Sequence, residues 1–236
     1  MRILAFIAHP DYTELFFGGT VVKYAMRGDE VYIVSVSPGE MGHPTIPPEE
    51  LANIRKEELR SAAKIEGIKE ARVLNFKDTE ISNTPELRLT MMKIIREIKP
   101  DIVITHWPKD AHPDLRETGQ AAIDACLLAY LGSIKTEHPP HVVKKVYTFG
   151  VPSSSIDFKP TVFIEITQVI DKKIEAAKCH RSMIESFAEG SVETWVSGIL
   201  GENRYWGREA GVMYAEAFAE VNIHALGRRA LDYLPL

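Results

Sequence analysis

The chain has 236 residues, 45% hydrophobic and 26% charged, which is enough to bury an ordinary globular core. Its 28 basic and 33 acidic residues give a net charge of −5, which excludes strong attraction to nucleic acid or anionic lipid and favours a small-molecule ligand. Cys126 and Cys179 have no CxxC spacing, and we interpret them as buried thiols in a reducing compartment. Because no signal-peptide pattern follows Met1 and no run of about 18 apolar residues occurs, we expect a cytoplasmic protein without a membrane partner.

Strand and helix patterns alternate through the first part of the chain. In chain order, strands are expected at residues 3–8, 30–36, 71–76 and 101–106, and helices at 18–27, 48–66, 84–99 and 115–131. Gly28 and Gly67 follow two of these helices and Pro100 follows a third, as helix-end preferences favour. Four strands alternating with four helices predict an α/β fold with a Rossmann-like, doubly wound, mainly parallel sheet.

Residues 132–236 follow a less regular pattern. Strands are expected at 144–149 and 161–166, a helix at 168–187, and a mostly helical tail from 191 to 226. The aromatic residues of this tail, which include Tyr205, are expected in its core. No linker, internal repeat or low-complexity segment divides the chain. We therefore expect a single domain over residues 1–236, with a Rossmann-like core in 1–131 and C-terminal strands and helices in 132–236.

The triplet His-Pro-Asp occurs twice, each time in a loop that follows a predicted strand. The first copy contains His9 and Asp11, and the second contains His112 and Asp114, with His106 at the end of the preceding strand. Each triplet on its own could simply form a turn. Because ligands are met at the carboxyl ends of parallel strands, we expect the two loops to form one cluster of imidazoles and carboxylates. Such clusters are the usual material of a hydrolytic or metal site.

Other motifs carry weaker signals. Gly18 and Gly19 do not form a dinucleotide fingerprint, and no G-x-S-x-G nucleophile elbow is present. Arg55 and Glu58 are spaced for one helical face, where a solvated ion pair and a substrate contact are equally good interpretations. His180 and His224 are isolated histidines, for which core or surface roles are favoured unless the fold brings them to the loops.

The motifs taken together form a pattern over nearly the whole chain. They are Ala8–Asp11 with Leu15 and Gly18–Thr20, Gly39–Gly42, Arg55–Glu58, Asp110–Asp114, Tyr205–Gly207 and Gly211–Glu216. This pattern resembles the PIG-L/LmbE-like family of zinc-dependent N-deacetylases. Members of that family remove acetyl groups from N-acetylglucosamine-type sugars, including bacillithiol and mycothiol precursors and chitobiose. The resemblance implies a small, sugar-like substrate and a homo-oligomer, either a trimer or a hexamer.

The resemblance also implies roles for individual residues. It makes His9 a zinc ligand, Asp11 the general base that activates water, and His112 the histidine that stabilises developing charge. We place Asp114 in the same catalytic group. The residues that we assign to substrate binding are Glu40, Arg55, Glu58 and His224.

Two of the three zinc-ligand positions implied by the resemblance hold unsuitable residues. Tyr12 stands at the second ligand position and Leu115 at the third, and Thr13 replaces the usual glutamate. Leucine has no lone pair, and a tyrosine phenol with a pKa of about 10 must lose its proton before it can bind a metal. A catalytic zinc needs three protein ligands and an open position. We therefore expect a degenerate site that holds zinc weakly or holds no cofactor.

Three functional interpretations follow from this combination. The favoured one is a deacetylase with a rearranged metal site, in which Asp11, His106, His112 or Asp114 replaces the missing ligands. The second is a metal-independent lyase or hydratase that uses Asp11 and His112 as acid and base. The third is a non-catalytic protein that binds a sugar- or nucleoside-like ligand. The residues alone leave all three open.

Overall fold

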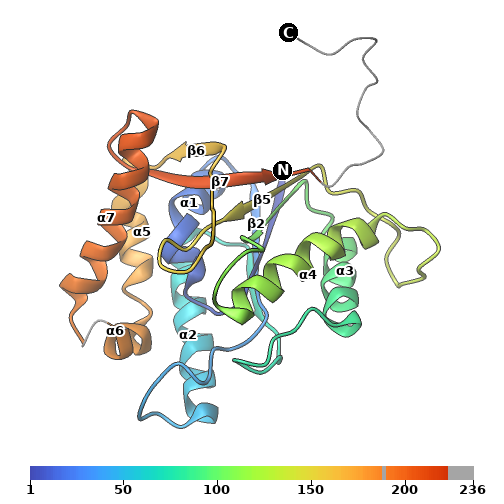
Figure 1. The fold of residues 1–236 in the computed structure, drawn as a ribbon, viewed down its shortest axis with the longest axis horizontal. Helices are drawn as coiled ribbons and strands as arrows, with labels where there is room; N and C mark the ends of the chain where they lie inside the picture. The colour runs from blue at the N-terminus through green and yellow to red at the C-terminus, as the bar shows by residue number, and fades with distance from the viewer. Residues whose placement is uncertain (188–189, 223–236) are drawn as a thin grey trace.

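The computed structural model describes residues 1–187 and 190–222. Their strands form one seven-stranded sheet in the order β3-β2-β1-β4-β5-β7-β6 (Figure 1). The strands are β1 (Arg2–Ile7), β2 (Glu30–Ser35), β3 (Glu70–Val73), β4 (Ile102–His106), β5 (Lys145–Phe149), β6 (Val162–Glu165) and β7 (Ala215–Val221). The first five strands pair in parallel, whereas β7 is antiparallel to both β5 and β6. The predicted Rossmann-like, mainly parallel sheet is confirmed.

Helices cover both faces of this sheet (Figure 1). They are the π-helix Thr13–Phe17, α1 (Gly18–Met26), α2 (Pro48–Glu66), α3 (Pro85–Ile98), α4 (Pro113–Ala129), the 3₁₀ turn Thr167–Val169, α5 (Ile170–Ala177), α6 (Arg181–Phe187) and α7 (Val192–Ala210). Alternate residues of β1 explain why both faces need cover. Leu4 and Phe6 pack in the core beneath α3 and α4, and Ile3 and Ile7 pack in the core beneath α1. A strand that is buried on both sides has no polar face, which accounts for its continuous apolar run.

The C-terminal part departs from the sequence prediction at three points. The helix expected at 168–187 is divided between α5 and α6, and part of the expected helical tail is the strand β7. Gly211, with φ of +73°, ends α7 and lets the chain turn into that strand. Tyr205 is 57% exposed, so its predicted core position is wrong.

The prediction of buried thiols holds for Cys126, which is buried, whereas Cys179 is only partly buried.

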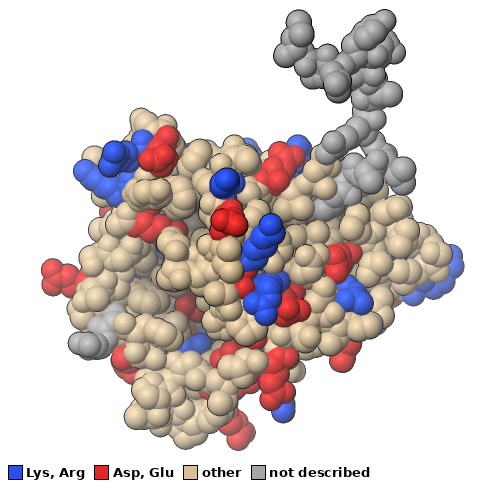
Figure 2. Space-filling view, viewed as in Figure 1, with Lys and Arg blue, Asp and Glu red and all other residues tan. Residues whose placement is uncertain are grey.

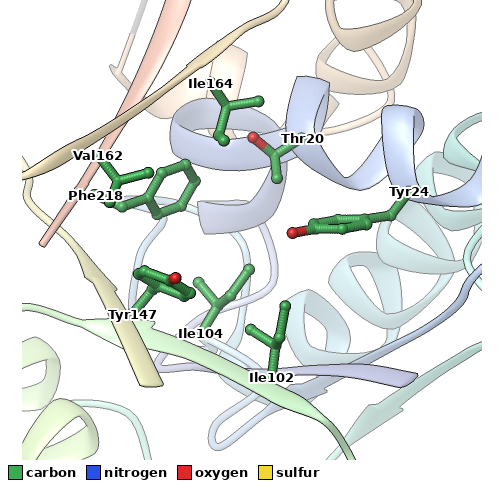
Figure 3. Close-up of a pocket in the computed structure, with 8 residues that line it drawn as sticks. All are labelled: Thr20, Tyr24, Ile102, Ile104, Tyr147, Val162, Ile164 and Phe218. Atoms are coloured by element: carbon green, nitrogen blue, oxygen red, sulfur yellow. The ribbon is translucent and has the colours of Figure 1, made fainter. Parts of the chain in front are cut away.

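A small apolar pocket lies between α1 and the strands β4 to β7 (Figure 3). Its volume is about 90 Å³, and Ile104 and Phe218 form part of its wall. Ile102, another lining residue, begins β4, whereas the His-Pro-Asp loops follow the carboxyl ends of β1 and β4. The pocket is therefore separate from the edge of the sheet where the two loops meet.

Acidic and basic side chains are interspersed on the face drawn in Figure 2, with no broad basic area on that face. Among the described residues, no helix is both long and apolar enough to cross a membrane.

Gly119 is predicted to be required for the close packing of α4 on β4. A Cβ atom at this position would overlap the backbone oxygen of His106. We expect Gly119→Ala to lower the free energy of unfolding by about 1–3 kcal/mol, although alanine is the better helix former. Gly201→Ala in α7 is the matched control, because no described atom beyond its chain neighbours and the surrounding helix backbone lies within 4 Å of the added Cβ. This change should stabilise the protein by up to about 1 kcal/mol. Urea denaturation measures both effects, and equal effects would contradict the packing argument.

Candidate active site

The two His-Pro-Asp loops meet at the carboxyl edge of the sheet, as the sequence predicts. His9 follows β1, and Asp114 lies in the first turn of α4. The His9 Nε2 atom is 3.1 Å from Asp114 Oδ2, and the rings of His9 and His112 have centroids 5.6 Å apart. Asp11 is 2% exposed in the same loop as His9. The π-helix that begins at Thr13 follows directly, a local irregularity that is frequent at functional sites.

Asp78 is a member of this cluster that the sequence analysis missed. Its Oδ1 atom is 2.9 Å from His9 Nε2, and the residue is 7% exposed. Asp78 lies in the loop after β3, so the same rule about carboxyl strand ends could have found it, but no motif marks the position. His9, Asp78 and Asp114 each offer one ligand atom, and these atoms all lie within 4.8 Å of one another. The cluster could therefore hold a metal ion.

Backbone amides hold the two carboxylates of the cluster in place. The Met41 N–H donates to Asp78 Oδ2 at 3.0 Å, and the Thr79 N–H donates to Asp114 Oδ2 at 2.7 Å. The Asp78 N–H donates in turn to Glu40 Oε1 at 3.0 Å. These bonds fix the carboxylates independently of His9, so the cluster is preorganised.

The two carboxylates determine the charge of His9 in the metal-free protein. Burial lowers the pKa of His9, but hydrogen bonds to Asp114 and Asp78 outweigh it and raise the pKa to about 9. Burial opposes ionisation of Asp78 as well, and the hydrogen bond from His9 is the main reason that its pKa lies below the usual range. At neutral pH the metal-free cluster is therefore an imidazolium between two carboxylates.

This charge state predicts a pH dependence of stability. The pKa of His9 rises from 6.5 to about 9 on folding, so its contribution is fully present below pH 6.5 and is lost as the pH rises through about 9. The loss should be roughly 3 kcal/mol. Urea denaturation with chelator at about pH 6 and pH 9.5 measures it, with His9→Gln as the control. The prediction fails if the wild-type protein and His9→Gln lose the same stability between these pH values.

His112 presents a hydrogen-bond donor to the site. Its Nδ1 atom accepts from the Asp114 N–H at 3.2 Å, which places the ring proton of the neutral imidazole on Nε2. Asp110 supports the loop, because its Oδ1 accepts from the His112 N–H at 2.9 Å and its Oδ2 accepts from the Ser155 hydroxyl at 2.7 Å. His112 is thus held in one orientation with an N–H group available.

Asp11 is suited to accept a proton. Among the described residues, none donates a hydrogen bond to its carboxylate, although the residue is almost fully buried. A buried carboxylate without donors gains a hydrogen-bond partner when a water molecule or substrate enters the site. The sequence prediction of Asp11 as general base is compatible with this placement.

His106 is placed for a structural role. Its Nε2 atom accepts from the Ala8 N–H at 2.9 Å, which ties β4 to the end of β1. Burial, followed by the charges of His9 and His112, lowers its pKa well below the ordinary value, so the ring is neutral. Its Nδ1 atom then carries the proton and is sealed from solvent. His106 has no free lone pair, and our suggestion that it replaces a metal ligand is wrong.

The two altered ligand positions offer no metal donor in the structure. Burial raises the pKa of Tyr12 above its ordinary value, and Asp11 and the neighbouring aspartates raise it further, so the phenol stays protonated. Leu115 is 1% exposed and packs in the core beneath α4. The expectation of a lost metal site is nevertheless not supported, because His9, Asp78 and Asp114 form a different set of potential ligands.

The residues assigned to substrate binding make internal contacts. Arg55 is 3% exposed and donates to the Gly42 carbonyl at 3.2 Å, so it is not part of a solvated ion pair. Glu58 accepts from the Ser182 N–H at 2.8 Å and joins α2 to α6. Glu40 supports Asp78, as described above. Their contacts with a substrate stay predictions, and His224 lies outside the described residues.

The isolated His180 is buried against Glu14. It is 1% exposed, and its Nε2 atom lies 2.9 Å from Glu14 Oε2. Its core role agrees with the interpretation favoured from the sequence.

Comparisons with known proteins connect this site to a family. The chain is 31% identical to the diacetylchitobiose deacetylase of Thermococcus kodakarensis over 225 residues, which cover 91% of this chain and 81% of the relative. Residues 4–126 match the family model PIG-L, described as GlcNAc-PI de-N-acetylase. The chain belongs to the PIG-L family. A PIG-L relative in Bacillus anthracis, described as a probable N-acetyl-alpha-D-glucosaminyl L-malate deacetylase 2, is 31% identical over 77% of this chain and 80% of its own length.

Solved structures support the PIG-L fold. The N,N'-diacetylchitobiose deacetylase from Pyrococcus horikoshii has a TM-score of 0.83 and 28% identity, over 93% of this chain and 83% of that one. The 4-carboxy-2-hydroxymuconate hydratase GalB has a TM-score of 0.75 at 23% identity, covering 99% of both chains. Because GalB carries out a different reaction on a similar fold, the reaction must be argued from the site.

Proposed function

We propose that this PIG-L protein hydrolyses the acetamide group of a small N-acetylated amino sugar and releases acetate and a free amine. The observation that carries the proposal is the pairing of Asp11 with His112. Asp11 is a buried carboxylate to which no described residue donates a hydrogen bond, and His112 is an oriented N–H donor. Both lie beside the cluster of His9, Asp78 and Asp114. The relatives that act on N-acetylated sugars support the substrate class.

The two residues would have different roles in amide hydrolysis. Asp11 accepts a proton from the attacking water as the water oxygen bonds to the carbonyl carbon. His112 donates a hydrogen bond from Nε2 to the carbonyl oxygen, where negative charge develops. Protonated Asp11 then returns its proton to the amide nitrogen as the C–N bond breaks. The products are acetate and the amino sugar, and the atoms of one water molecule are consumed.

Metal chemistry fits this site, because imidazole nitrogen and carboxylate oxygen are ordinary zinc ligands. A metal ion held by His9, Asp78 and Asp114 would polarise the acetamide carbonyl and favour loss of a proton from water. The residues of the chain supply the orientation. Asp114 fixes the tautomer of His112 through its N–H, and Glu40 holds the loop that carries Asp78.

Amine release tests the proposal directly. The purified protein is incubated with N-acetylglucosamine, N,N'-diacetylchitobiose and N-acetylglucosaminyl malate, and new primary amine is measured with a fluorogenic reagent. We expect turnover of at least one of these compounds and none by Asp11→Asn. If no amine appears with any of them at high enzyme concentration, with and without added zinc, the proposed substrate class is wrong. Amine formation that is equal in Asp11→Asn would contradict the assigned base.

A further inference from the structure

The geometry points to a metal centre held by His9, Asp78 and Asp114, in which the two aspartates replace the ligands missing at positions 12 and 115. This inference deepens the proposed function, since it names the cofactor centre of the same site. The inference rests on the arrangement of the three side chains. It can be tested separately from the proposed function, because metal binding can be measured without turnover.

The ligand positions 12 and 115 implied by the family lack suitable donor atoms in this chain. At position 12 the chain offers a phenol, which at its ordinary pKa of about 10 keeps its proton at neutral pH. At position 115 it offers a buried aliphatic side chain, so a metal at the family position would keep only His9. One protein ligand is too few for a catalytic zinc site, which ordinarily has three. Any metal retained by the protein must therefore find other donors close to His9.

The side chains of Asp78 and Asp114 meet this requirement. Their oxygens lie 2.9 Å and 3.1 Å from the same atom, His9 Nε2. Ligand atoms around a tetrahedral ion with bonds of about 2.0–2.1 Å lie about 3.3 Å apart, so a small outward adjustment would admit the ion. Three protein ligands leave an open position, as catalytic sites require.

Two features of the cluster indicate a ligand that the protein itself does not supply. Asp114 is fully buried, yet its Oδ1 atom has no hydrogen-bond partner in the described part of the chain. A buried carboxylate oxygen without a partner is costly in the absence of a ligand. The other Asp114 oxygen and Asp78 Oδ2 are held by backbone N–H groups, which is the outer-shell support that metal-binding carboxylates usually have.

The donor set also predicts the kind of metal. One imidazole and two carboxylates provide more oxygen and more negative charge than a site with two histidines. Carboxylate ligands suit Mn²⁺ as well as Zn²⁺, so we expect both ions to bind, with Zn²⁺ bound more tightly.

Metal binding to the chelator-treated, metal-free protein tests the inference. Zn²⁺ is titrated in competition with a chromogenic chelator, and the bound metal is counted by mass spectrometry after desalting. We expect about one equivalent in the wild-type protein and an affinity at least about 100-fold lower in Asp78→Asn. Tyr12→Phe is the matched control, because it alters the family position without removing a proposed ligand. It should bind zinc with wild-type affinity.

Several results would overturn the inference. One is less than about a tenth of an equivalent of zinc in the wild-type protein, since a preformed three-ligand site should retain the ion. Another is unchanged affinity in both Asp78→Asn and Asp114→Asn. If Tyr12→Phe fails to bind zinc, the Tyr12 phenolate of the wild-type protein would be a ligand, contrary to the inference. Circular dichroism of each variant checks its fold, and the wild-type stoichiometry decides the matter if the aspartate variants do not fold.

The measurement separates this inference from the proposed function. A protein that binds zinc through the three residues but hydrolyses no N-acetyl sugar would support the metal centre and contradict the deacetylase. A protein that releases amine at full rate with no bound metal would support the deacetylase and contradict the metal centre.

Discussion

Asp11→Asn is expected to lower kcat for amide hydrolysis by about 10²–10⁴-fold, because asparagine cannot accept the proton of the attacking water. The side chain keeps its size, and no described residue donates a hydrogen bond to the Asp11 carboxylate. The variant should therefore fold normally and keep a KM within a few-fold of the wild-type value. Initial rates of amine release, with circular dichroism as the check of the fold, measure the effect.

A second readout makes the Asp11 prediction specific. The acidic limb of the pH profile of kcat/KM reports the ionisation of an essential base in the free enzyme. It should disappear from any residual activity of Asp11→Asn. An unchanged pH profile with full activity would assign the base to another group.

His112→Ala is expected to lower kcat by about 10²–10³-fold with a smaller change in KM, because the lost N–H group acts mainly on the oxygen that gains charge in the transition state. The Asp114 N–H, which donates to His112 Nδ1, remains at the helix start and can be hydrated. Steady-state kinetics on a shared substrate compare the variant with the wild-type protein.

His112→Gln is the matched control for this experiment. A glutamine amide offers an N–H donor from a side chain of similar length, so it should recover part of the lost kcat. If the alanine and glutamine variants are equally impaired, the N–H group is not the source of the effect. A loss confined to KM would give His112 a role in substrate binding alone.

The order of strands and helices in the first half of the chain was predictable because each element has an independent local signal. The apolar run that became β1, and the glycine and proline residues at helix ends, each constrain one element. Parallel topology then follows from the alternation of strands and helices. The meeting of the two His-Pro-Asp loops follows from that topology, which is why His9, His112 and Asp114 were found together.

β7 was missed because its local signal conflicts with its place in the sheet. Its sequence, AEAFAEV, is rich in alanine and glutamate, which are strong helix formers. The segment is a strand because it pairs with β5 on one side and β6 on the other. Tertiary pairing overrides local propensity in such cases, and no short window of sequence reports it.

Asp78 and His106 show why the full donor set could not be read from the sequence. Asp78 is a single carboxylate outside any motif, and it reaches His9 only because the β3 loop is held by Glu40 and Met41. His106 has the residue type of a ligand, but β4 places its Nε2 against the Ala8 N–H. A side chain's availability depends on hydrogen bonds that form only when neighbouring strands are in register.

Incorporation of oxygen from solvent water into the acetate product tests the proposed deacetylase mechanism most directly. The deacetylase mechanism predicts that reaction in ¹⁸O-labelled water gives acetate with one ¹⁸O atom for each amine formed, as mass spectrometry can detect. A lyase or hydratase acting on the same substrate would form no acetate. Turnover that leaves the acetamide group intact, or yields no labelled acetate, would contradict the proposal that this PIG-L protein is an N-deacetylase.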